Sequence, residues 1–195
     1  MVSLNVLFYI FLVLFATIGM IRGFRKEIVV TVAGILGLFI IEVVMPKIFG
    51  TLEGTKVLIM NLIILFGVAF FGYQTPSFRR FTESGRFERD SLLDLLLGGL
   101  TGALNGYIFF STAWFYLAKA GYPFSWISAP DPNTGVGQAA INLLNDAFPN
   151  VLTGNWLYIA LAAAVAIVLA VILDEKSALY RNWWNRHLSH CQAAS

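Results

Sequence analysis

The stretch Leu95–Leu117, LLLGGLTGALNGYIFFSTAWFYL, is a run of 23 residues without a charged side chain. A helix needs roughly 20 predominantly apolar residues to cross the hydrocarbon core of a bilayer, so this run is long enough to span a membrane. It lacks the strict alternation of apolar and polar residues that is typical of membrane β-barrel strands. The segment therefore predicts a transmembrane helix.

Further apolar runs lie before and after this one. The predicted spans, in chain order, are Val2–Ile21, Ile28–Met45, Val57–Tyr73, Leu95–Leu117 and Val151–Leu173. If so many helices were the core of a soluble protein, the remainder of a 195-residue chain would hold too little polar sequence to cover its surface. Because only helices and closed barrels satisfy their backbone polar groups in lipid, the sequence predicts an all-α, polytopic membrane bundle of about five transmembrane helices.

Lys and Arg residues are concentrated in alternate connections between these spans. One side of the predicted membrane carries Arg22, Arg25, Lys26, Arg79, Arg80, Arg86, Arg89, Lys176, Arg181 and Arg186. The other side carries only Lys47, Lys56 and Lys119. The positive-inside rule then predicts an external amino terminus and a cytoplasmic carboxyl terminus. We expect the basic residues to contact anionic lipids rather than nucleic acid, since the formal net charge is only +2.

The first span carries no basic residue ahead of its apolar run, whereas secretory signal peptides do. We therefore expect it to be retained as a membrane helix.

Few polar side chains fall inside the spans. Glu42 lies near the outer end of the second span, and Asp94 stands at the inner entrance of the fourth, where we expect it to cap that helix. A coupling-ion or proton role for either carboxylate is the alternative. Asn105 is the deepest polar side chain, and we expect it to hydrogen-bond a neighbouring helix, a contact worth on the order of 1 kcal/mol; substrate contact is the alternative. The lack of an ionisable side chain near a midplane argues against a proton-driven pump.

Glycines recur at every fourth position on one face of the fourth span, at Gly98, Gly102 and Gly106, and Gly19 and Gly23 repeat the spacing at the end of the first. Such rows of small residues let helix backbones approach closely in lipid. The pattern predicts a tight helix contact, either within the bundle or with a second copy or another membrane subunit.

The connection 118–150 is expected on the outer face and contains an amphipathic pattern. Its apolar positions are Val136, Ala139, Ala140, Leu143, Leu144, Ala147 and Phe148, and its polar positions are Gln138, Asn142, Asn145 and Asp146. This spacing predicts a short helix that lies on the membrane surface.

The carboxyl-terminal tail combines aromatic and basic residues, as helices along a membrane interface do. Tyr180, Trp183 and Trp184 alternate with Lys176, Arg181 and Arg186. His187, His190 and Cys191 follow, but no second ligand pair stands at a recognised zinc spacing. The chain also lacks a phosphate-binding loop, a nucleophile elbow and paired catalytic carboxylates. We therefore expect no metal, no cofactor and no enzymatic activity.

Two segments resemble the signatures of the colicin V production protein (CvpA) family. Ile18–Glu27, IGMIRGFRKE, resembles the amino-terminal signature, and Leu93–Gly106, LDLLLGGLTGALNG, resembles the second. The matching positions are Arg22, Gly23, Asp94, Gly98, Gly102 and Gly106, while Asn105 stands where the family commonly has Arg. The resemblance covers residues 1–120, so that 121–150 is a separate outer loop and 151–195 an additional span with its tail.

The resemblance implies a protein of the bacterial inner membrane that takes part in peptide toxin production or export and in envelope maintenance, without enzymatic activity. Two other classes of function fit the same sequence. The chain would be an accessory structural subunit of a larger respiratory or photosynthetic complex, or it would be a small transporter or channel.

Overall fold

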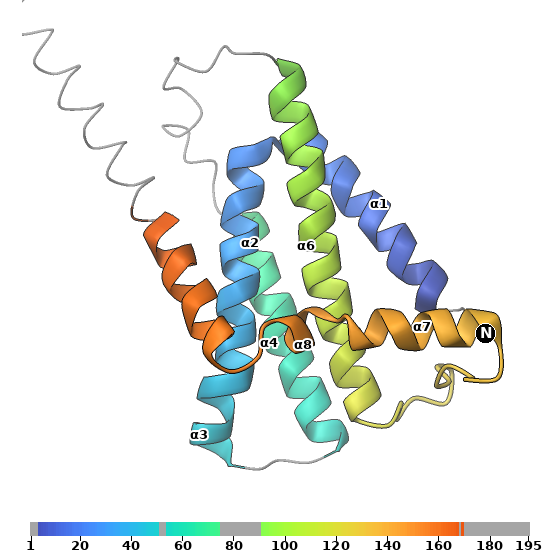
Figure 1. The fold of residues 1–195 in the computed structure, drawn as a ribbon. Helices are drawn as coiled ribbons and strands as arrows, with labels where there is room; N and C mark the ends of the chain where they lie inside the picture. The colour runs from blue at the N-terminus through green and yellow to red at the C-terminus, as the bar shows by residue number, and fades with distance from the viewer. Residues whose placement is uncertain (1–3, 51–53, 75–90, 168, 170–195) are drawn as a thin grey trace, which may run out of the picture.

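The computed structural model describes residues 4–50, 54–74, 91–167 and 169. Every regular element in these residues is a helix, and none of these residues forms a strand. The predicted all-α fold is therefore confirmed (Figure 1).

The structure combines long helices with short ones that pack near one end of the bundle (Figure 1). The elements are α1 (Leu4–Arg22), α2 (Phe24–Phe39), the π-helix η1 (Ile40–Val44), α3 (Met45–Phe49), α4 (Thr55–Gln74), α6 (Ser91–Lys119), α7 (Gly135–Asn145) and α8 (Phe148–Val151). An apolar helix follows over Asn155–Ile167. Four segments are long and apolar enough to cross a bilayer: Leu4–Arg22, Phe24–Phe49, Thr55–Gln74 and Leu92–Lys119. The chain is a multispanning membrane protein.

Helix α6 is the centre of the bundle. It lies between α1 and α2, and α4 packs against α2 and, less extensively, against α6 (Figure 1). Val30 of α2, Leu65 of α4 and Phe109 of α6 belong to one buried cluster, which marks the core. Outward-facing positions such as Val13 and Ile63 are also apolar, with 67% and 66% of their surface exposed. An exposed apolar surface of this kind suits contact with lipid.

The second span differs from its predicted bounds, Ile28–Met45. The structure has a continuous helical segment over Phe24–Phe49, so the helix begins before Ile28 and continues past Met45. Glu27, which the sequence pattern places in the preceding connection, therefore lies inside the helix.

Pro46 does not end this helix, although it follows directly on the predicted span. Because Pro46 has no N–H, it cannot bond the carbonyl of Glu42 four residues earlier. The helix instead widens over Ile40–Val44, where the N–H of Met45 bonds the carbonyl of Ile40. Such a π-helical turn lets a helix pass a local disruption without breaking.

The predicted amphipathic helix of residues 136–148 is present, divided into α7 and α8. The Thr134 hydroxyl caps α7 by accepting a hydrogen bond from Gly137 N, at 3.0 Å. Ala140 packs beside Phe8 and Trp114, which lie on α1 and α6. The short helix therefore covers the end of the bundle where α1 begins (Figure 1).

The predicted apolar positions are divided between exposed and buried ones. Val136 and Ala139 are exposed, while Ala147 and Phe148 are buried. The chain leaves the helix at Asp146 and starts α8 at Phe148, so Ala147 and Phe148 are positioned separately from α7.

The last predicted span, Val151–Leu173, starts later than expected. Helix α8 ends at Val151, and Gly154 has φ +55°, a conformation that suits glycine and reverses the chain. The helix then runs over Asn155–Ile167 and packs on α2, where Tyr158 meets Phe39 edge to face. Residue 168 and residues 170–195, including the aromatic and basic tail, lie outside the described residues, as do Arg79, Arg80, Arg86 and Arg89.

Candidate functional site

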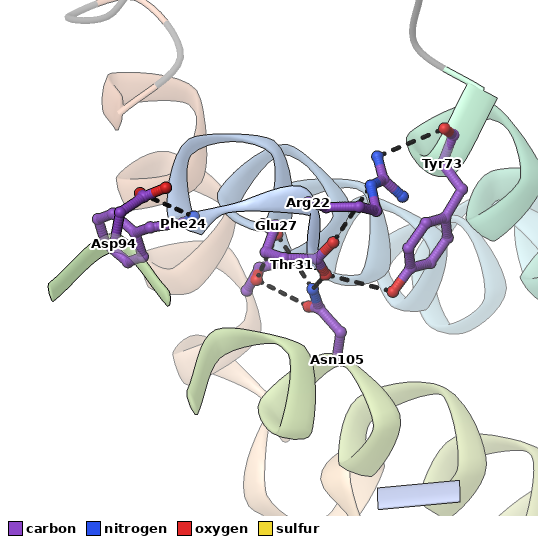
Figure 2. Close-up of polar contacts among 7 residues, drawn as sticks. All are labelled: Arg22, Phe24, Glu27, Thr31, Tyr73, Asp94 and Asn105. Carbon is purple, nitrogen blue, oxygen red and sulfur yellow. Dashed lines mark hydrogen bonds and ion pairs between the residues drawn. The ribbon is translucent and has the colours of Figure 1, made fainter. Parts of the chain in front are cut away.

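Glu27 is the most unusual side chain of the bundle, because it is a carboxylate with 0% of its surface exposed. It stands in the first turn of α2, and its partners come from α1, α4 and α6 (Figure 2). An isolated charge in an apolar interior is so costly that it must be paired and hydrogen-bonded. We refer to Arg22, Glu27, Thr31, Tyr73 and Asn105 as the Glu27 cluster.

The two carboxylate oxygens of Glu27 have different partners. Oε2 accepts a hydrogen bond from Asn105 Nδ2 at 2.8 Å and one from the Tyr73 hydroxyl at 3.3 Å. Oε1 lies 3.4 Å from Arg22 Nε, which forms an ion pair with it but no hydrogen bond. The charge of Glu27 is thus compensated by one cation and two neutral donors.

The amide of Asn105 joins α6 to α2 through both of its ends. Its Nδ2 also donates to the main-chain carbonyl of Glu27, at 3.0 Å, and its Oδ1 accepts from the Thr31 hydroxyl, at 2.7 Å. Asn105 is itself 0% exposed. The hydrogen bond to a neighbouring helix that the sequence predicts for Asn105 is present, and its partner is a charged residue.

Arg22 closes the cluster on the side of α1 and α4. Its guanidinium lies 4.3 Å from the centre of the Tyr73 ring, and Nη2 donates to the Tyr73 carbonyl at 3.4 Å. That carbonyl belongs to the last turn of α4, where main-chain oxygens lack helical partners and the helix dipole favours a cation. Arg22 therefore holds the ends of α1, α2 and α4 together.

Asp94 lies beside the start of α2, close to the Glu27 cluster. It lies in the first turn of α6, as the sequence predicts, and its Oδ1 also accepts a hydrogen bond from Phe24 N, at 3.2 Å, at the start of α2 (Figure 2). The first N–H groups of a helix have no partner within the helix, so this carboxylate supplies one from α6. A cap of this kind contributes on the order of 1 kcal/mol.

The glycine rows meet each other between α1 and α6. A Cβ placed on Gly102 would lie 2.9 Å from the Cα of Gly19, and one placed on Gly106 would lie 2.9 Å from the Cβ of Phe15. Gly98 also meets the main chain of Gly19. The predicted close helix contact exists, and in this structure it lies within the bundle.

Gly23 joins this contact to the Glu27 cluster. With φ +84° it ends α1 in a conformation that L side chains rarely adopt, and a Cβ there would lie 2.6 Å from a carboxylate oxygen of Asp94. All the candidate residues named from the sequence therefore lie along one junction of α1, α2 and α6. They are Arg22, Gly23, Asp94, Gly98, Gly102, Asn105 and Gly106.

Sequence reasoning overlooked Glu27, Thr31 and Tyr73 as members of this site. When only hydropathy is considered, the charge of Glu27 is assigned to the basic connection before the second span. Helical spacing, however, places Glu27 on the same face as Val30 and Leu38, which are both fully buried. This spacing is the sequence feature that could have indicated the burial of Glu27.

The site combines one acid, one guanidinium and neutral hydrogen-bonding groups. The described residues contain no group of three or more His, Cys, Asp or Glu side chains that could hold a metal ion. No family model, curated protein or solved structure matches the chain. The cluster links α1, α2, α4 and α6 through one ion pair and several hydrogen bonds.

Proposed function

We propose that this chain is a non-enzymatic protein of the bacterial cytoplasmic membrane that serves peptide export and envelope maintenance. The observation that carries the proposal is the meeting of the two segments that resemble the CvpA signatures. They are separated by more than one span in the sequence, yet they form one continuous contact at a single end of the bundle.

The contact between the two segments involves both backbone and side chains. Gly19 packs on Gly102, the Asp94 carboxylate bonds the first turn of α2, and Asn105 bonds Glu27. This arrangement gives a physical reason for residues of these types to occur together at these spacings. It supports a shared architecture with the family that the segments resemble, and the function follows from that resemblance.

The same proposal includes a surface for other membrane components. Many large apolar side chains of α1 and α4 are exposed, for example Ile21 and Phe71, at 81% and 74%. Lipid acyl chains suit such a surface, and so do the helices of a second copy or of another membrane subunit. Because the glycine rows are occupied by the α1–α6 contact, an oligomer would use these outward faces.

The orientation of the chain can be tested with its single cysteine, Cys191. With the amino terminus outside and the carboxyl terminus in the cytoplasm, a membrane-impermeant maleimide should leave Cys191 unlabelled in intact cells and label it after permeabilisation. Lys47→Cys in a chain with Cys191→Ser is the matched external position, and it should react in intact cells. Labelling of Cys191 from outside would contradict the proposed orientation.

The function is tested by deleting the gene and restoring it on a plasmid. We expect the deletion strain to secrete less of a peptide toxin and to become sensitive to detergents and bile salts, because a bundle that supports export and the envelope is missing. The wild-type chain should restore both properties. Unchanged secretion and detergent resistance in the deletion strain would contradict the proposal.

Purification of the chain from native membranes in mild detergent tests the alternative of an accessory subunit. Stoichiometric co-purification of large respiratory or photosynthetic subunits would favour that role.

A small transporter or channel is the second candidate function, and Glu27 is the observation that favours it. A buried ionisable residue inside a membrane bundle is costly and usually marks a pathway or a coupling site. The sequence argues against a proton-driven pump because no ionisable side chain lies near a midplane. Glu27 lies in the first turn of α2, away from the midplane, but its burial places an ionisable group inside the bundle.

A further inference from the structure

The chain between α7 and the last helix packs against the sides of α2 and α6. Phe148 N donates a hydrogen bond to Ser111 Oγ of α6 at 3.1 Å, and Ser111 is only 2% exposed. Tyr158, at the start of the last helix, meets Phe39 of α2. Helix α3, the first turns of α4 and the last turns of α6 all extend beyond α8 (Figure 1). Helix α8 therefore lies beside the bundle rather than on top of it.

The lysines at this end of the bundle give the depth of these contacts. Ser111 lies eight residues before Lys119, and Phe39 lies eight residues before Lys47. At about 1.5 Å per residue, each spacing is about 10–12 Å along a helix. The edge and the middle of the hydrocarbon core are about 15 Å apart. Because lysine ammonium groups stay at the membrane interface, α8 and the start of the last helix lie well below it.

Polar groups are concentrated at this depth. Over residues 145–155, the exposed positions apart from Val151 are Asn145, Asp146, Asn150, Thr153, Gly154 and Asn155. We call these six residues the polar connection. Its main chain leaves helical geometry at Asp146 and again at Leu152. An irregular main chain and a carboxylate are too costly to face acyl chains, so a polar medium must contact this surface.

Buried contacts hold the polar connection at this level. Phe148 belongs to a cluster with one residue from each neighbouring helix, namely Leu38, Ile108 and Leu157. Moving α8 to the level of the lysines would open this cluster. It would also separate the Phe148 N–H from the Ser111 hydroxyl, and buried polar groups without partners are costly.

Two exposed aromatic side chains stand beside the polar connection. Trp156 and Tyr158 have 66% and 52% of their surface exposed. Trp and Tyr prefer the headgroup layer of a bilayer, where one part of the ring system is apolar and the other is wet. The contact of Tyr158 with Phe39 places this preference at the depth of the polar connection, not at the level of the lysines.

We propose that the outer leaflet is thinned beside α8, so that water rather than acyl chains contacts the polar connection. Bilayers thin locally around polar groups and around apolar helices that are shorter than the core. The last helix starts at the depth of Phe39 and therefore does not cross the rest of this leaflet. The inference assigns the bundle a water-exposed side and does not depend on the role in export.

The test compares cysteine reactivity at similar depth on two sides of the bundle. Thr153→Cys places a thiol in the polar connection, and Ile63→Cys places one on the exposed apolar face of α4, seven residues from Lys56. Both chains also carry Cys191→Ser and are treated with a membrane-impermeant maleimide in intact cells. The reactive thiolate forms in water, so we expect Thr153→Cys to react at least about tenfold faster than Ile63→Cys, at a rate close to that of Lys47→Cys.

Asn155→Cys is the second probe of the polar connection and should react as Thr153→Cys does. These two positions are preferred to Asn150, whose Nδ2 bonds the carbonyls of Leu144 and Asn145 at the end of α7. Every variant should react completely in dodecyl sulfate, which shows that its thiol is present. Size-exclusion chromatography in mild detergent shows that each chain is folded.

Thr153→Cys and Asn155→Cys chains that react as slowly as Ile63→Cys would overturn the inference, whether acyl chains, a second copy or another subunit covers the polar connection. An Ile63→Cys chain that reacts as fast as the two probes would overturn it as well, because the two sides of the bundle would not differ. Reaction of Lys47→Cys only after permeabilisation would contradict the proposed orientation alone, and the same comparison would then be made in permeabilised cells. The deletion strain tests the export role separately.

Discussion

Arg22→Leu is expected to destabilise the folded chain by about 3 kcal/mol, because it leaves the Glu27 carboxylate buried without its cation. Arg22 Nε lies 3.4 Å from Glu27 Oε1, and the Glu27 side chain is fully buried. Breaking a buried pair on one side typically costs about 3–5 kcal/mol. We expect the lower end of that range because Asn105 and Tyr73 still donate to Oε2. Unfolding in mixed micelles with increasing dodecyl sulfate measures the change.

The double variant Arg22→Leu, Glu27→Leu provides the decisive comparison. Removing both charges leaves no unpaired ion, and an apolar replacement of a buried pair is often neutral. The double variant should therefore be more stable than Arg22→Leu alone. Lys47→Leu, at an exposed position of α3, is the matched control and should change stability by no more than about 0.5 kcal/mol. A single variant as stable as wild type would mean that Glu27 is not held as a buried ion by Arg22.

The helical architecture was predictable because hydropathy reports directly on the solvent that each segment requires. Leu95–Leu117 lies inside α6, and Val57–Tyr73 lies inside α4, each close to the observed bounds. Helix ends were predicted less well. Hydropathy treats Glu27 as a boundary, whereas the structure buries it with partners from helices that are distant in the sequence.

The polar site could be predicted only in part, since its members come from four helices and their pairing depends on packing. Asn105 could be predicted as a site residue because it is a polar residue in the middle of an apolar run. Tyr73 could not be predicted in this way, since tyrosine is common at the ends of membrane helices. Asp94 was recognised as a capping residue, but the identity of the capped helix depends on the position of α2 beside α6.

The π-helix at Ile40–Val44 could not be predicted from the sequence for the same reason. The predicted second span ends at Met45, directly before Pro46. The chain instead adopts one wider turn and continues to Phe49. Whether a proline breaks, kinks or widens a helix depends on what the freed carbonyl can meet in the bundle, and that information is tertiary.

The glycine contact between α1 and α6 gives the second large prediction. Gly102→Leu should prevent the native packing of these helices, since even its Cβ would lie 2.9 Å from the Cα of Gly19 and closer still to the Phe15 carbonyl oxygen. Both are main-chain atoms, so no side chain can rotate away. Overpacking usually costs about 1–3 kcal/mol, and we expect more here because two helices must separate. Size-exclusion chromatography and a thermal melt in detergent measure the yield of folded protein.

Gly67→Leu is the matched control, because a Cβ on Gly67 of α4 meets nothing within 4 Å. This variant should fold with wild-type yield, since the added side chain points away from the rest of the chain. A difference between the two glycines would locate the effect in the α1–α6 contact rather than in the helix propensity that both substitutions improve. Equal and near-wild-type behaviour of both variants would contradict the packing of Gly102 on Gly19. It would also remove the contact on which the joining of the two CvpA-like segments depends.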